Sequence, residues 1–296
     1  MRTSMQDKAF YFLNYSLLFV AALTSVLPVI HIAAISLSGE SAIMSGFVGL
    51  WPVDINWQSY AYLMKGTKIM SSFWNSVQIT LIGTGLSLIF TILGAYPLTR
   101  AYMIGRRFFM LAIMFTMIFG GGLIPTYLVV KSVGLIDSYW ALWALSLISP
   151  WNLLIMVGFL RQIPTELEDA AHIDGCGDMR LLFSVILPLS LPVMATLAVF
   201  YGVSYWNSFM SVLIYINDPA KFNLSVFVNE IVRQLDVSVA SSTDAILQLN
   251  SMQSTLLTAE SVKAASIFIM IVPMLVVYPF LQKYFVKGAL VGSIKG

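Results

Sequence analysis

Few residues of this chain have the types and spacing that catalysis or metal binding requires. Its 296 residues include two histidines, His31 and His172, and one cysteine, Cys176. Two isolated histidines form neither a metal site nor an acid–base pair. The sequence also contains no GxxxxGK[ST] phosphate loop, no HExxH helix and no GxSxG elbow. We therefore expect no catalytic residue, no metal site and no ATPase site in this chain, and we expect His31 to hydrogen-bond a neighbouring helix.

One short motif points to a different chemistry. Residues 175–178 read Gly-Cys-Gly-Asp, the GxGD pattern of intramembrane aspartyl proteases. Those enzymes need this aspartate inside a span, together with a second aspartate that usually follows a tyrosine in a neighbouring span. Asp178 lies instead in a charged stretch, and no Tyr-Asp pair occurs in the sequence. An intramembrane enzyme is therefore kept as an alternative function for this chain, although little in the sequence supports it.

The acidic run before this motif has the pattern of a short surface helix. Thr165 followed by Glu168 makes a capping box, which predicts a helix that starts at Glu166. Gly175 is placed to end that helix in the left-handed conformation. Asp178 can then cap a second helix over residues 179–187. We expect two short helices joined by a tight turn.

The first of these helices carries residues suited to docking. Its small side chains allow another protein to approach closely, and its carboxylates suit a basic partner. The residues that recur at helical spacing are Leu167, Ala170, Ala171 and Asp174, and the neighbouring carboxylates are those of Glu168 and Asp169. This pattern predicts a protein-binding surface.

Composition places the rest of the chain in a membrane. Hydrophobic residues make up 58% of the sequence and charged residues 10%, with a mean hydropathy of +0.85. A soluble domain has about 25% charged residues, so this chain lacks the polar surface to stay in water. The formal net charge of +2 gives no reason to expect a nucleic-acid partner.

Six apolar stretches are long enough to cross a bilayer, which takes about 20 helical residues. They lie at about 10–37, 73–98, 108–130, 139–160, 188–214 and 264–286. These runs are continuous, so a barrel of short alternating strands is excluded. The sequence predicts an all-α membrane protein whose residues 1–296 form one domain, with an inner loop at 161–187 and a long outer loop at 215–263.

The distribution of Lys and Arg predicts the orientation. With the N-terminus inside, ten basic residues fall on cytoplasmic segments and six on outer segments. The short stretch between the second and third spans, with Arg100, Arg106 and Arg107 and no acid, gives the clearest indication. We expect both termini in the cytoplasm and the two short helices on that side.

The inner loop resembles a known motif. Residues 168–171 read Glu-Asp-Ala-Ala, Asp174 and Gly175 follow, and residues 185–188 read Val-Ile-Leu-Pro after nine more positions. This resembles the EAA coupling motif of ATP-binding-cassette importer permeases, with Asp169 in place of Glu and Val185 in place of Ile. The resemblance implies that the contact with the ATPase is made by Glu168, Asp169, Ala170, Ala171, Asp174, Gly175, Leu187 and Pro188.

Other parts of the chain are similar to one class of these permeases. Asn56-Trp57-Gln58-Ser59-Tyr60, Phe73-Trp74-Asn75-Ser76 and the ending from Tyr284 to Gly296 look like the carbohydrate-uptake class. They are similar to the smaller maltose permease subunit. The ending and Gly120-Gly121-Gly122 look most like permeases for alginate- and aldouronate-type oligosaccharides. The resemblance implies an oligosaccharide substrate, with another small solute as the alternative.

The family's mechanism supplies the expected partners. The resemblance implies a second permease chain in a heterodimer, two ATPase subunits that hold ATP and magnesium, and an extracytoplasmic solute-binding protein. It implies a site in the bacterial cytoplasmic membrane and alternating access driven by those ATPase subunits. This chain would need no cofactor of its own, and the outer loop would meet the binding protein.

Sugar contacts in the spans call for amides, hydroxyls and aromatic faces. Such groups are costly in hydrocarbon unless they face a cavity or another helix. The candidates for a substrate pathway are Asn75, Gln78, Asn152, Tyr205, Trp206 and Asn207. Packing between helices is the competing explanation for Trp206 and Asn207.

Overall fold

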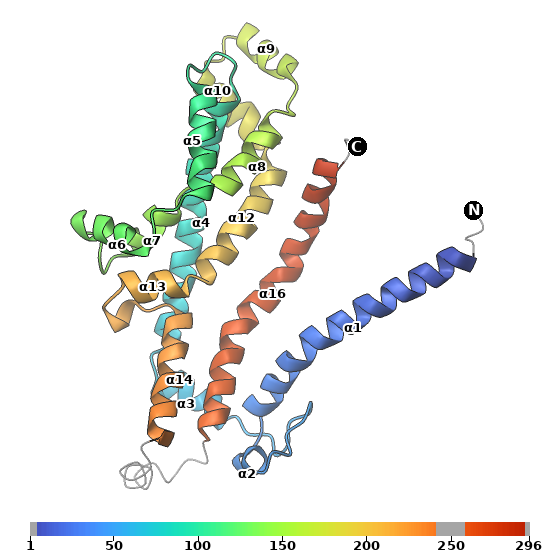
Figure 1. Cartoon of the computed structure of the whole chain (residues 1–296), viewed down its shortest axis with the longest axis vertical. Helices are drawn as coiled ribbons and strands as arrows, with labels where there is room; N and C mark the ends of the chain where they lie inside the picture. Colours follow the sequence, from blue (N-terminus) through green and yellow to red (C-terminus); the bar gives the residue numbers. More distant parts are fainter. Residues whose placement is uncertain (1–4, 241–257, 294–296) are drawn as a thin grey trace. The chain divides into compact units, whose positions relative to one another are not determined.

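The regular structure of the chain is helical. The computed structural model describes residues 5–240 and 258–293, and in these ranges every regular element is a helix (Figure 1). Three helices are each long and apolar enough to cross a bilayer, namely α1 (Met5–Ser36), α4 (Ile69–Thr99) and α16 (Ala259–Ser293). The all-α membrane fold predicted from the apolar runs is confirmed.

Three further crossings are pairs of helices that bend at a short break. The pairs are α5 (Arg106–Ile118) with α6 (Leu123–Ser132), bent by 116°, α7 (Tyr139–Ser146) with α8 (Pro150–Leu160), bent by 48°, and Asp178–Leu189 with α12 (Leu191–Trp206), bent by 78°. If each pair is one crossing, the described part of the chain has six. This agrees with the six spans expected from the sequence.

The continuity expected for the third, fourth and fifth spans is wrong, and the fourth, residues 139–160, divides between Ser146 and Pro150. Residues 108–130 divide at Gly120–Gly122, where Gly122 has a φ of +80° that residues with side chains rarely adopt. Residues 188–214 divide at Ser190 and again after Trp206, beyond which α13 (Phe209–Tyr215) begins. Pro192 just after the first break lacks the N–H that an uninterrupted helix would use.

Shorter helices fill the segments between the crossings, namely α2 (Glu40–Met44), α3 (Gln58–Gly66), α9 (Thr165–Ile173) and α14 (Leu224–Ala240). Within the fifth crossing, Asp178–Leu189 comprises α10 (Asp178–Leu181), a further turn at Leu182–Ile186 and α11 (Leu187–Leu189). The expected outer loop at 215–263 contains a 3₁₀ turn at Pro219–Lys221, α14 and the first residues of α16. Residues 241–257 of that loop lie outside the described residues.

The chain divides into two compact units. One comprises Met1–Met70 and Val228–Met274, and the other comprises Ser71–Phe227 and Leu275–Gly296. In the first unit the hydroxyl of Ser59 on α3 donates to that of Ser261 on α16 at 2.8 Å. The Nδ1 atom of His31 lies 2.8 Å from the carbonyl oxygen of Gly49. The expected bond from His31 to a neighbouring helix is therefore wrong, because Gly49 belongs to the irregular segment after α2.

The second unit packs α4, α8 and α12 around one apolar core. Ile79, Leu153, Met156 and Leu197 are among its buried side chains. At one end of this unit, Asp137 between α6 and α7 accepts from the ammonium of Lys221 at 2.9 Å. That hydrogen bond, followed by one from the backbone N–H of Asp218, holds the pKa of the Asp137 carboxyl below its ordinary value.

Loops that follow alternate crossings lie on the same side of a membrane, and two such pairs of loops contact each other here. The loop after α6 meets the loop after α13 through Asp137 and Lys221. The stretch after α4 meets α9 at the ion pair of Arg100 with Glu168. Loops that the sequence assigns to the same side of the membrane thus contact each other within the second unit.

Tyrosines of α12 lie against small residues of α4. The Tyr205 hydroxyl is 3.0 Å from Ser87 Oγ, and its ring covers Gly83. A Cβ placed on Gly83 would come within 2.7 Å of that ring, closer than carbon atoms can pack. The absence of a side chain at Gly83 therefore sets the approach of the two helices.

We predict that Gly83→Val destabilises the second unit by about 1–3 kcal/mol, the usual cost of overpacking. The matched control is Gly85→Val on the same helix, because no atom lies within 4 Å of a Cβ there. The measurement is the thermal unfolding midpoint of the purified protein in detergent. Equal midpoints for the two variants would contradict the proposed contact.

Candidate functional site

The helix α9 ends in the way that the sequence predicted. Gly175 has a φ of +75°, and the N–H of Cys176 donates to the carbonyl of Ala171 at 2.9 Å. This bond spans six residues and closes a Schellman motif, which only a left-handed residue at Gly175 permits. The turn sends the chain directly from α9 into α10. The helix itself begins at Thr165, one residue earlier than expected.

The second short helix differs from its prediction. Gly177 rather than Asp178 is the N-cap of α10, and the next turn, Leu182–Ile186, is π-helical. Pro188 follows this turn, and a proline lacks an N–H and crowds the carbonyl one turn earlier, so a wider turn accommodates it. The Asp178 side chain instead hydrogen-bonds Tyr102. Burial, and then this hydrogen bond, raise the pKa of the Tyr102 hydroxyl.

An ion pair ties α9 to the end of α4. The guanidinium of Arg100 donates to the carboxylate of Glu168, and the two side chains are 9% and 16% exposed. The same guanidinium lies over the ring of Tyr96, 4.2 Å from its centroid. The Glu168 carboxylate is thus engaged within the chain, while Asp169 is exposed. Neither Arg100 nor Tyr96 was assigned a role in this site from the sequence.

The motif residues divide between an inner and an outer face. Ala171 is buried against the second unit's core, and Leu187 is half-buried. The exposed motif residues are Asp169, Ala170, Asp174, Gly175 and Pro188. Apolar side chains stand beside them at the surface, namely Leu167, Ile173, Met179 and Phe183, which are 43–87% exposed. An apolar surface with an acidic rim in a loop of this kind is typical of a protein-binding site.

At the break between α7 and α8, backbone groups that lack a partner within their helix hydrogen-bond to side chains of other helices. The N–H of Ser149 donates to the Tyr201 hydroxyl at 3.0 Å, and Thr91 Oγ1 lies 2.7 Å from that hydroxyl. The Ser87 hydroxyl lies 3.3 Å from the freed carbonyl of Ser146 and donates to it. A break in a span is tolerated only with such partners.

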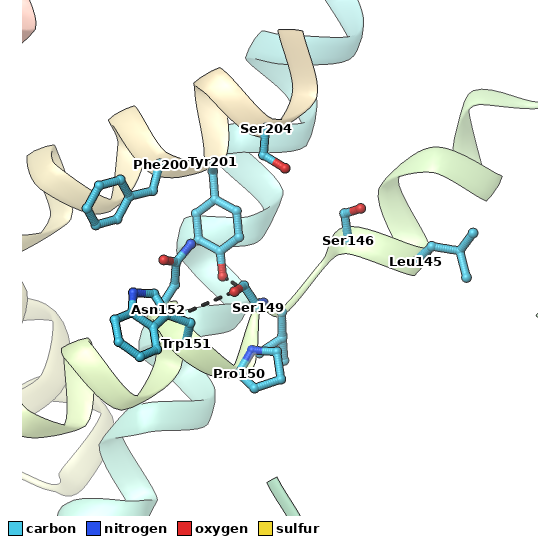
Figure 2. A pocket seen from close by; sticks show the side chains of 10 residues that line it. Leu145, Ser146, Ser149, Pro150, Trp151, Asn152, Phe200, Tyr201 and Ser204 are labelled. Carbon is cyan, nitrogen blue, oxygen red and sulfur yellow. Dashed lines mark hydrogen bonds between the residues drawn. The ribbon is translucent and has the colours of Figure 1, made fainter. Parts of the chain in front are cut away.

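A cavity of about 410 Å³ opens at this break (Figure 2). Its lining is mainly aromatic and hydroxyl-bearing, with no charged side chain, and consists of Leu145, Ser146, Ile148, Ser149, Pro150, Trp151, Asn152, Phe200, Tyr201 and Ser204. A second cavity of about 270 Å³ shares Ser146 and Ser204 with the first. The two lie along one side of α12. Among the described residues, no three His, Cys, Asp or Glu side chains gather as a metal site would require.

The structure brings together only some of the six pathway candidates. Asn152 lines the first cavity, and Tyr205 and Asn207 line the second. Asn75 donates instead to the backbone carbonyls of Ala220 and Phe222, at 2.8 and 3.0 Å.

The two remaining candidates line neither cavity. Trp206 is 8% exposed and packs edge-on against Phe73, with ring centroids 6.1 Å apart. Gln78 is exposed. Ser146, Ser149 and Trp151 were not identified as lining residues from the sequence. A break between two apolar helices is hard to recognise from the sequence.

Comparison with known proteins decides the family. The model of the family described as "Binding-protein-dependent transport system inner membrane component" matches residues 8–291. The chain belongs to this family. Members of this permease family act with a solute-binding protein and with ATPase subunits, so the chain is a transport component.

Individual relatives agree over the full length. The Bacillus subtilis "Polygalacturonan/rhamnogalacturonan transport system permease protein YtcP" is 42% identical, over 99% of this chain and 100% of its own. Protein LplC of the same organism is 40% identical, over 94% and 91%. A crystal structure of a bacterial ABC transporter involved in the import of the acidic polysaccharide alginate contains a chain with a TM-score of 0.87 and 30% identity, covering 96% of this permease and 99% of that chain.

We predict that Glu168→Gln releases α9 from α4. Removing one partner of a nearly buried ion pair costs about 3 kcal/mol or more, so amide hydrogen exchange in α9 should quicken by about 100-fold. Asp169→Asn is the control, because this neighbouring carboxylate is exposed. The reversed pair, Arg100→Glu with Glu168→Arg, should recover part of the protection. Equal exchange in the two single variants would contradict this role for the ion pair.

Proposed function

We propose that the chain is the permease subunit of an ATP-binding-cassette importer for oligosaccharides, including acidic ones. It pairs with a second, related permease chain and receives its substrate from an extracytoplasmic solute-binding protein. Both of its termini face the cytoplasm. ATP and magnesium are held by two partner ATPase subunits, and their closure drives alternating access. The names of the relatives support a carbohydrate substrate, and two of them concern acidic polysaccharides.

The surface of the segment from α9 to Phe183 is the observation that carries this proposal. Asp169 and Asp174 offer carboxylates there, and Ile173 and Met179 offer apolar area that no described part of the chain covers. The inner side of the same segment is fixed by Ala171 and by the ion pair of Glu168. A segment held on one side and exposed on the other transmits a push from its partner to α4 as a rigid body.

The coupling role predicts a specific loss of function. We expect Gly175→Asp to reduce the ATPase stimulation that the binding protein and oligosaccharide cause, by about tenfold or more, since tenfold corresponds to only about 1.4 kcal/mol. The measurement is ATP hydrolysis by the reconstituted importer. Asp169→Lys should act in the same way through charge reversal, without backbone strain.

The chain offers a matched control for the glycine. Gly134 has a φ of +74° against +75° for Gly175, and a Cβ added at either position would have no atom within 4 Å. Gly134→Asp therefore adds the same strain and charge at a site between α6 and α7. The coupling assignment would be refuted if Gly175→Asp and Gly134→Asp reduced the ATPase stimulation equally, or if neither reduced it. Stimulation by a non-carbohydrate solute would refute the substrate class alone.

The cavity at the α7–α8 break supports a place for the sugar in this chain. Trp151 is 62% exposed there and offers an aromatic face, beside Asn152 and the hydroxyls of Ser149 and Ser204. A neutral lining of this kind suits sugar rings and hydroxyls. The substrate pathway therefore runs past Asn152, Tyr205 and Asn207.

We expect Trp151→Ala to raise the KM for oligosaccharide uptake by about tenfold, at the upper end of what a lost aromatic contact costs. The measurement is uptake of labelled oligosaccharide by vesicles that contain the complete importer. Trp140→Ala is the control, because Trp140 is similarly exposed at 55% and lines neither cavity. The two variants having the same KM would argue against a pathway along this cavity.

A further inference from the structure

Three arginines gather around a small pocket between α5 and α8. The pocket has a volume of about 270 Å³ and is lined by Arg106, Arg107, Met110, Leu111, Met114 and Arg161. Arg106 and Arg107 open α5, and Arg161 is the C-cap of α8. One side of the pocket is therefore cationic and the other is apolar. The ATPase contact described above uses none of these residues.

The positive charges of this pocket have no carboxylate beside them in the described part of the chain. Arg106, Arg107 and Arg161 take no part in the ion pairs of Arg100 with Glu168 and of Lys221 with Asp137. Arg106 makes a long hydrogen bond of 3.5 Å to the carbonyl of Arg100. Three guanidinium groups thus share one pocket without an acidic side chain, which is costly near a membrane of low dielectric constant.

The start of α5 adds to this positive potential. Gly105 is its N-cap and provides no side-chain hydrogen bond, and the first turn contains no acidic residue. A helix N-terminus has free N–H groups and about half a positive charge, so the arginines at its start are placed unfavourably. A bound anion would satisfy the N–H groups and relieve the repulsion between the arginines.

The apolar side of the pocket indicates what kind of anion fits. Leu111 is 63% exposed and Met114 is 39% exposed, and Phe115 continues this apolar face of α5 at 58%. Inorganic phosphate would use the arginines alone and would gain no binding energy from these apolar side chains. A phospholipid would place its phosphate on the guanidinium groups and its acyl chain along Leu111 and Met114. Basic pockets between membrane helices bind anionic headgroups in this way.

We propose that this pocket is a binding site for an anionic phospholipid. The proposal does not depend on the transported substrate, and it holds whether or not the coupling assignment is correct. Each arginine near a membrane surface contributes about fivefold to the affinity for an anionic lipid, so two of them contribute about 30-fold.

The test compares phosphatidylglycerol with phosphatidylcholine of the same acyl chains. The complete importer in detergent is titrated with each lipid, and bound lipid is counted by native mass spectrometry while the melting temperature is followed. We expect tighter binding and a higher melting temperature with phosphatidylglycerol. Arg107→Gln with Arg161→Gln should weaken phosphatidylglycerol binding by about 30-fold and leave phosphatidylcholine binding unchanged.

The control variant removes the same number of positive charges at positions outside the pocket. Lys8→Gln with Lys131→Gln removes two exposed cations that line no part of the pocket and lie outside the segment from α9 to Phe183. An equal loss in this control would show a general charge effect and overturn the proposal. So would stabilisation by inorganic phosphate alone, which would mark a free-anion site, or release of the ATPase subunits by the pocket variants, which would mark a protein interface. If the double variant does not assemble, each single variant should show a loss of about fivefold.

Discussion

Within hydrocarbon a backbone amide that leaves its helix has no water to bond, and the second unit is organised around this constraint. The crossing made of α7 and α8 is broken, so its free carbonyl at Ser146 and its free N–H at Ser149 need partners. Ser87 on α4 and Tyr201 on α12 provide them. These bonds require α4 and α12 to stay close, which the bare backbone at Gly83 allows. The break can therefore line a cavity while the Ser146 carbonyl and the Ser149 N–H keep hydrogen-bond partners.

The same helix α4 connects this cavity with the exposed segment from α9 to Phe183, the proposed docking surface for the ATPase. Ser87 lies near the middle of α4, and Arg100 just past its end holds α9 through Glu168. In the proposed mechanism a displacement of α9 reaches the cavity through α4, by way of the Arg100–Glu168 ion pair and the hydrogen bond of Ser87. This arrangement suits a transporter in which force is applied at one end and the substrate passes at another.

Long-range pairing explains which features the sequence could and could not predict. The left-handed Gly175 follows from a local signal and was found, and α9 begins within one residue of its prediction, although Glu168 pairs with Arg100 and does not close the expected capping box. The bend after α5 was missed because hydropathy shows how long an apolar stretch is and contains no information on the direction of the helix axis. The partner of Glu168 was missed because Arg100 lies 68 residues away, and no local pattern links them. Asn75 was predicted to be a pathway residue because the sequence shows an amide within a span and does not show its partner. In the structure this amide binds the backbone of the loop at Ala220 and Phe222.

The position of Cys176 has a practical consequence for studying motion. It is the sole cysteine of the chain, and it lies half-buried at the turn that joins α9 to α10. A fluorophore or spin label attached to this thiol would report from the joint between the two helices, with no need to remove other cysteines from this chain. The native sequence thus already provides a spectroscopic handle at the joint between α9 and α10.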